Sequence, residues 1–140
     1  MLRVIWCGVL ALCSIGIPVQ VQAKGVLYDC DITEKRQGVG WISDKMAIVV
    51  MQNGRVVVSD AVILQFNRQP MQVRVGRNTD RKLVIRWTLN NVVNGSNQTT
   101  PAFEYSATLK KATNEIAVYA NPDGYPTRFS GKGRCTLRHG

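Results

Sequence analysis

The sequence RFSGKGRCTLR, residues 128–138, carries the pattern that decides the fold. Alternate positions hold Phe129, Gly131, Gly133, Cys135 and Leu137, and the positions between them are polar or basic. Successive side chains of a β-strand point to opposite faces, so this period of two predicts a strand with one buried and one solvated face. The stretch therefore predicts a C-terminal strand whose cysteine points into a hydrophobic core.

The same alternation recurs in four earlier stretches, residues 26–33, 71–75, 82–89 and 103–110. We therefore expect an all-β domain in which about eight short strands form an antiparallel meander. Closure into a barrel, complete or nearly so, is the favoured architecture because closure removes exposed strand edges. A two-sheet β-sandwich is the alternative.

Turn signals separate these strands. Asn53-Gly54 lies between two apolar runs and is a strong hairpin signal, and Asn121-Pro122-Asp123-Gly124 has the composition of a tight turn. Residues 111–114 predict a shorter turn. Residues 90–101 are polar and too long for a simple hairpin, which predicts a mobile loop. No amphipathic helix of useful length is expected.

The first 23 residues have the organisation of a secretory signal peptide. Arg3 precedes an apolar run from residue 4 to residue 17, and Val21-Gln22-Ala23 places small residues before a cleavage site. We expect cleavage after Ala23, which leaves residues 24–140 as a single secreted β-domain. The mature chain would then have no transmembrane segment and would be secreted or periplasmic.

Two of the four cysteines leave with this leader, so Cys30 and Cys135 are the cysteines of the mature domain. Export places the domain in an oxidising compartment, where an even number of cysteines favours disulfide formation. The C-x-x-C spacing of a redox pair is absent. We therefore predict a buried disulfide between Cys30 and Cys135 that joins the first and last strands.

No catalytic motif is found, and the chain is predicted not to be an enzyme. Its single histidine, His139, is next to the last residue, so a histidine-dependent nucleophilic system is not expected. Zinc sites need several histidine or cysteine ligands, and the cysteines are better explained as a disulfide. The sequence therefore predicts no catalytic residue, no metal site and no cofactor.

Positive charge is the one functional clue. The chain carries 18 Lys and Arg residues against nine Asp and Glu residues, for a net charge of +9. In two predicted strands the basic side chains lie opposite the core, which defines a candidate anion-binding face. Its members are Arg74, Lys82, Arg86, Arg128, Lys132, Arg134 and Arg138.

A cationic face of this kind attracts anionic polymers, lipid headgroups or acidic proteins. Nucleic acid is not expected as a partner, because export removes the usual target and the outward positions carry few aromatic residues for base stacking. The first functional hypothesis is therefore a non-enzymatic exported binding module that recognises an anionic envelope component or acidic partner.

Two other functions are open at this point. A small apolar-ligand carrier would bind its ligand inside the barrel, in a site lined by Tyr28, Trp87, Phe103, Tyr105 and Phe129. An inhibitor or structural envelope protein is the third possibility. The expected architecture, a small exported barrel with joined ends, resembles that of the C-type lysozyme inhibitors. The resemblance involves no motif, so it implies no site residue.

Overall fold

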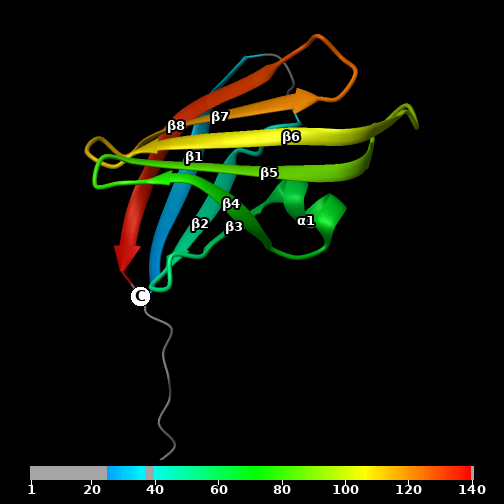
Figure 1. Cartoon of the computed structure of the whole chain (residues 1–140). Helices are drawn as coiled ribbons and strands as arrows, with labels where there is room; N and C mark the ends of the chain where they lie inside the picture. Colours follow the sequence, from blue (N-terminus) through cyan, green and yellow to red (C-terminus); the bar gives the residue numbers. More distant parts are fainter. Residues whose placement is uncertain (1–24, 37–39, 140) are drawn as a thin grey trace, which may run out of the picture.

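The computed structural model describes residues 25–36 and 40–139, and within them eight antiparallel strands close into a barrel in sequence order (Figure 1). The strands are β1 (Gly25–Arg36), β2 (Lys45–Met51), β3 (Val56–Asp60), β4 (Met71–Asn78), β5 (Lys82–Val93), β6 (Thr99–Lys110), β7 (Glu115–Pro122) and β8 (Phe129–His139). A short helix, α1 (Ala61–Asn67), connects β3 to β4. The predicted all-β barrel is thereby confirmed, and the sandwich alternative is wrong. The predicted signal peptide and its cleavage site lie outside the described residues.

The barrel interior is filled by the apolar half of each alternating strand. Ile85, Ala107 and Val118 are mutual Cα partners across β5, β6 and β7, and each is at most 1% exposed. Val75 and Leu137 fall on the inward side of the sequence pattern but are 39% and 40% exposed. Burial therefore follows the period-two pattern closely, with exceptions such as these two residues.

The barrel closes where β8 pairs with β1. Cys30 and Cys135 are direct Cα partners in this seam, their Cα atoms are 3.8 Å apart, and their Sγ atoms are at the disulfide distance of 2.03 Å. Both cysteines are buried, at 0% and 6% exposed. The predicted pairing of the terminal strands is thus present in the fold.

Three turns match their predictions, and the predicted long loop is wrong. Residues 111–114 form the expected short turn between β6 and β7. Gly54 has φ +86° at the tip of the β2–β3 hairpin, and Gly124 has φ +79° in the turn after β7. Residues 90–101, however, are not a long loop. β5 and β6 continue through most of this segment, and Asn94 closes a short turn because its backbone N–H donates to the carbonyl of Gln98 at 3.0 Å. The side-chain oxygen of Asn94 also accepts from the backbone N–H groups of Ser96 and Gln98.

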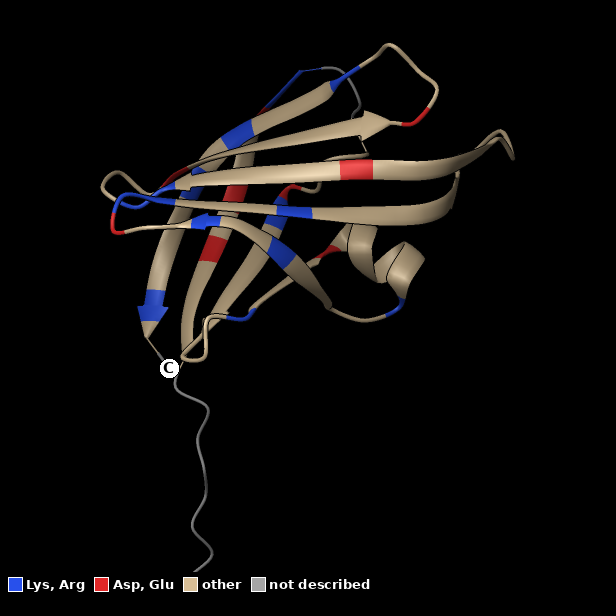
Figure 2. Ribbon diagram, viewed as in Figure 1, with Lys and Arg blue, Asp and Glu red and all other residues tan. Residues whose placement is uncertain are grey.

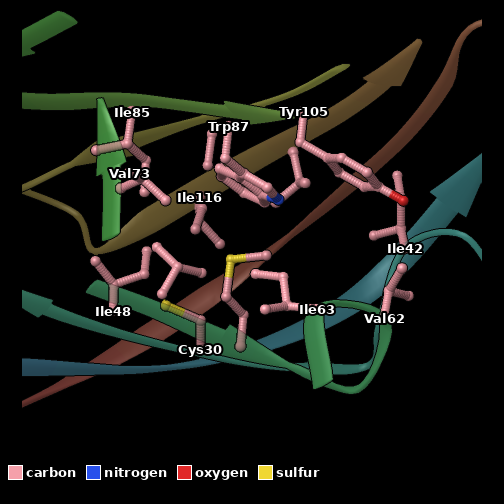
Figure 3. Close-up of a cluster of buried hydrophobic side chains, with 14 of the residues drawn as sticks. Cys30, Ile42, Ile48, Val62, Ile63, Val73, Ile85, Trp87, Tyr105 and Ile116 are labelled. Atoms are coloured by element: carbon pink, nitrogen blue, oxygen red, sulfur yellow. The ribbon is translucent and has the colours of Figure 1, made fainter. Parts of the chain in front are cut away.

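Helix α1 was not predicted. Asp60 is its N-cap, with Oδ1 accepting from the backbone N–H of Ile63 at 2.7 Å, and Arg68 ends it in a left-handed conformation. Val62 and Ile63 are buried in the core, and Figure 3 shows the Val62 side chain near Ile42. The helix therefore covers one end of the barrel. No helix within the described residues is long and apolar enough to cross a bilayer.

Candidate functional site

The predicted anion-binding residues fall into two groups on strands that are not neighbours. The first group is Arg74 on β4 with Lys82 and Arg86 on β5, and the second is Arg128, Lys132, Arg134 and Arg138 on or just before β8. In the barrel, β8 pairs with β7 and β1, so β6 and β7 separate it from β5. The seven residues therefore do not form one continuous patch.

The β8 group is interspersed with carboxylates. Arg134 pairs with Glu115 at 3.7 Å, and Arg138 pairs with Asp29 at 3.6 Å. Lys132 is the Cα partner of Glu34 on β1. Exposed pairs of this kind contribute little to stability, but the mixture of signs lowers the net positive potential around β8.

A groove of about 460 Å³ lies over this mixed-charge region. Three basic and three acidic residues contribute to its lining, together with threonines and small residues. The charged members are Lys110, Lys132, Arg134, Asp31, Glu34 and Glu115. Because the two signs are equal in number, the groove has no preference for an anion.

The first group belongs to a larger cationic region, which we call the β4–β5 basic surface. Its members are Arg74, Arg77, Arg81, Lys82, Arg86, Lys110 and Lys111. Contacts between two turns bring them together: the backbone N–H of Lys111 donates to the carbonyl of Arg81 at 2.9 Å, and its Nζ donates to Asn78 Oδ1 at 2.7 Å. Figure 2 shows the basic segments of β4 and β5 and of the turns at their common end.

Carboxylates are fewer here than around β8. Asp80 lies in the β4–β5 turn, Glu104 faces outward on β6, and Glu115 is the Cα partner of Lys110. Lys110 ends β6 and Lys111 begins the turn after it, so both were missed in the sequence because they lie far along the chain from Arg81. The pairing of Lys82 with Lys110 and the contact between the β4–β5 and β6–β7 turns bring them beside Arg81.

The second pocket opens on this side of the barrel and has a volume of about 330 Å³. Arg74 and Arg86, which are direct Cα partners on β4 and β5, contribute to its lining, and both are exposed. Thr88, Glu104, Ser106 and Asn121 complete its polar surface. Among the described residues, neither arginine forms an ion pair. The pocket therefore presents two guanidinium groups without an ion-pair partner, together with one carboxylate and three neutral hydrogen-bonding side chains.

The aromatic residues proposed for an interior ligand site are part of the packed core. Trp87 stacks on Tyr105 with ring centroids 5.4 Å apart, and Phe103 stacks on Tyr105 at the same distance. The Tyr105 hydroxyl donates to the carbonyl of Trp41 at 2.9 Å, and burial raises the pKa of Tyr105. Tyr28 is 7% exposed, and Phe129 packs against the same core. These side chains are therefore part of the buried core of the barrel.

One carboxyl group lies inside the covered end of the barrel. Asp60 is 6% exposed, and burial raises its pKa, while hydrogen bonds from the backbone N–H groups of Ile63 and Val62 and from Ser43 oppose that shift. The Ser43 hydroxyl oxygen also accepts from Val62 N–H at 3.3 Å. The N-cap role of Asp60 in α1 explains why a carboxyl group is buried at this position.

Within the described residues, no cluster of three or more His, Cys, Asp or Glu side chains is arranged to hold a metal ion. Comparison with known proteins finds no matching protein-family model, no matching curated protein and no matching solved structure.

Proposed function

We propose that this chain is a non-enzymatic exported binding module that recognises an anionic envelope component or an acidic partner through the β4–β5 basic surface. The observation that carries the proposal is the gathering of seven basic side chains on one side of the barrel, where β4, β5 and the end of β6 pair. The leader-like N-terminal sequence and the cysteine pair at disulfide distance support export to a secreted or periplasmic location.

Charge distribution favours this surface over β8. Seven basic side chains gather on β4, β5, the end of β6 and the adjoining turns, whereas Arg134 and Arg138 on β8 each have a carboxylate partner within 4 Å. Long-range attraction depends on net local charge, so an anionic polymer approaches the less neutralised face more readily. The packed interior supports a surface-binding module rather than a carrier of apolar ligands.

The test compares two triple variants that lose the same charge. Arg77→Gln, Arg81→Gln and Lys110→Gln together alter the β4–β5 basic surface, whereas Lys132→Gln, Arg134→Gln and Arg138→Gln alter β8. Binding to polygalacturonate and to vesicles containing phosphatidylglycerol is measured by titration at 0.05 M and 0.5 M salt. We expect the first variant to lose at least tenfold in affinity at low salt and the second to lose less than threefold.

Binding by the wild-type protein should weaken as salt rises, because the Debye length falls from about 10 Å at 0.1 M to about 3 Å at 1 M. Equal losses in the two triple variants would mean that net charge alone governs binding, and the proposed surface would be rejected. Wild-type protein that binds neither probe at low salt would reject the proposed function.

A further inference from the structure

The pocket beside Arg74 and Arg86 is built from two neighbouring outward rows of the barrel. In one row, Arg74 pairs with Arg86, which pairs with Ser106 on β6. In the next row, Thr88 pairs with Glu104, which pairs with Asn121 on β7. Successive outward rows are about 7 Å apart along a strand, and neighbouring strands are about 4.8 Å apart. The six residues thus surround an area that can accommodate a single small ring.

The two arginines at one side of this area form an unfavourable pair in the free protein. Residues directly opposite on antiparallel strands have Cβ atoms about 4.5–5.5 Å apart, and like charges in this arrangement destabilise a sheet. In the described part of the chain, no carboxylate lies within ion-pair distance of Arg74 or Arg86. A bound anion between the guanidinium groups would relieve this repulsion and accept their charge-assisted hydrogen bonds.

The other side of the pocket selects against a dense polyanion. Glu104 is exposed in the same pocket, so a second negative charge placed there would be repelled. Its carboxylate can accept hydrogen bonds and cannot donate them, whereas the Thr88 hydroxyl and the Asn121 amide can do both. This half of the pocket therefore suits neutral groups that carry hydroxyl donors.

We propose that this pocket binds one acidic sugar unit, a hydroxylated ring that bears a single carboxylate or phosphate. Arg74 and Arg86 bind the anionic group, and Thr88, Glu104, Ser106 and Asn121 hydrogen-bond to ring hydroxyls. The volume of about 330 Å³ is at the small end of the range of about 300–1,000 Å³ typical of ligand pockets. The inference rests on the proposed function and narrows its ligand class from anionic polymers in general to acidic saccharides.

Titrations of the full mature domain with small probes, followed by two-dimensional amide NMR, test this inference. Galacturonate is compared with acetate, glucose 6-phosphate with inorganic phosphate, and glucose serves as the neutral control. We expect at least one acidic sugar to bind at least tenfold more tightly than its simple anion and than glucose. It should shift the amide signals of Thr88, Glu104, Ser106 and Asn121. Comparison of galacturonate with glucose 6-phosphate then shows whether the pocket prefers a carboxylate or a phosphate.

Neutral substitutions separate this pocket from general electrostatic attraction. Thr88→Ala and Asn121→Ala change no charge, so charge-driven binding should be the same in these variants. We expect each to weaken acidic-sugar binding at least fivefold, while Ser59→Ala, an outward position on β3, leaves it unchanged. Glu104→Gln should strengthen binding of acetate and phosphate. It should also lower the preference for the acidic sugar over its simple anion at least fivefold.

The two proposals fail in different ways. If polygalacturonate binding depends on Arg77, Arg81 and Lys110 but is unchanged by Thr88→Ala and Asn121→Ala, the basic surface stands and the sugar pocket is rejected. If Glu104→Gln strengthens binding of every anion equally, or if polyglutamate binds as tightly as polygalacturonate, the saccharide assignment is also rejected. Loss of galacturonate binding in Asn121→Ala with no effect of the surface triple variant would reject the polymer-binding function and retain the pocket.

Discussion

At the scale of single residues, Gly133 shows how closely β8 approaches β1. A Cβ atom at this position would lie 1.8 Å from the carbonyl oxygen of Asp31 and 2.8 Å from the Cα of Ile32. Both contacts are with backbone, so no side-chain rotation can relieve them. We expect Gly133→Ala to destabilise the fold by about 2–4 kcal/mol, at or above the usual cost of overpacking.

Urea denaturation measures this effect, with Gly95→Ala as the matched control. A Cβ atom at Gly95 meets no atom within 4 Å, so this substitution should change stability by less than about 0.5 kcal/mol, as is typical of open surface positions. Equal stability of the two variants would show that β8 does not approach β1 this closely.

Asp60 gives the molecule a pH-dependent contribution to stability. Burial raises the pKa of its carboxyl in the folded protein, so the unfolded chain releases this proton first as pH rises. Asp60 therefore reduces stability as pH rises from the unfolded value of about 3.9 through its higher folded value. Asp60→Asn keeps an N-cap side chain and removes the charge.

We expect Asp60→Asn to match the wild type at pH 3 and to be more stable at pH 7. Urea denaturation at pH 3, 5 and 7 should show the difference in stability growing with pH. A variant that is less stable than wild type at pH 7 would mean that the ionised carboxylate favours folding.

The candidate site could be predicted only in part from individual residues. Alternation correctly placed Arg74 and Arg86 on the outer face, because a single strand determines the face of each residue. It did not show that Arg134 has Glu115 as a partner, because the two residues belong to different strands. Strand register determines which charged side chains become neighbours. The alternation within a single strand carries no information about that register.

At the scale of elements, strands were easier to predict than their connections. Helix α1 has the sequence AVILQFN, whose β-branched Val62 and Ile63 are equally suited to a strand. The signals for a helix were the N-cap residue Asp60 before this segment and Pro70 shortly after it. Seven residues are too few to show a clear helical period in the sequence. The helix is stabilised by packing against the core, which the local sequence pattern does not show.

The β5–β6 hairpin depends on one side chain that the sequence analysis treated as part of a loop. The Asn94 side-chain oxygen accepts from the backbone N–H groups of Ser96 and Gln98 at 2.9 and 3.0 Å. Asn94→Ala removes this acceptor, and each such bond typically contributes about 0.5–1.5 kcal/mol. We expect a loss of about 1–2 kcal/mol and faster amide hydrogen exchange at Val93 and Thr99.

Asn97 lies in the same turn and provides a control substitution that should leave stability unchanged. Its φ is +59°, a region that glycine enters without steric cost, so Asn97→Gly should leave the turn intact and preserve stability within about 0.5 kcal/mol. Unchanged hydrogen exchange in Asn94→Ala would contradict the role assigned to its side chain.

At the scale of the whole molecule, the barrel followed from alternation, turn spacing and the positions of the two cysteines. The distribution of charge around it did not. Strand order places β8 away from β4 and β5, so the two basic groups face different surroundings. A net charge of +9 on the chain therefore describes neither the mixed surface around β8 nor the more cationic β4–β5 basic surface.

The Cys30–Cys135 pair joins the first and last strands, and the two cysteines are 105 residues apart in sequence. A cross-link over a loop of about this length should stabilise the fold by about 4–5 kcal/mol, if its main effect is to restrict the unfolded chain. Ten register pairs also connect β1 to β8, so the seam does not depend on the disulfide alone. We expect Cys30→Ala with Cys135→Ala to retain a β-rich circular-dichroism spectrum while losing about 4–5 kcal/mol of stability.

Urea denaturation also tests the physical origin of this loss. A chain without the cross-link exposes more surface when it unfolds, and the dependence of unfolding free energy on urea concentration increases with that surface. The double variant should therefore show a steeper urea dependence than the oxidised wild type. Thiol labelling of the denatured, non-reduced mature domain, which lacks the leader cysteines, should find no free cysteine. Two labelled cysteines, or a stability loss below about 1 kcal/mol, would contradict a stabilising disulfide at this seam.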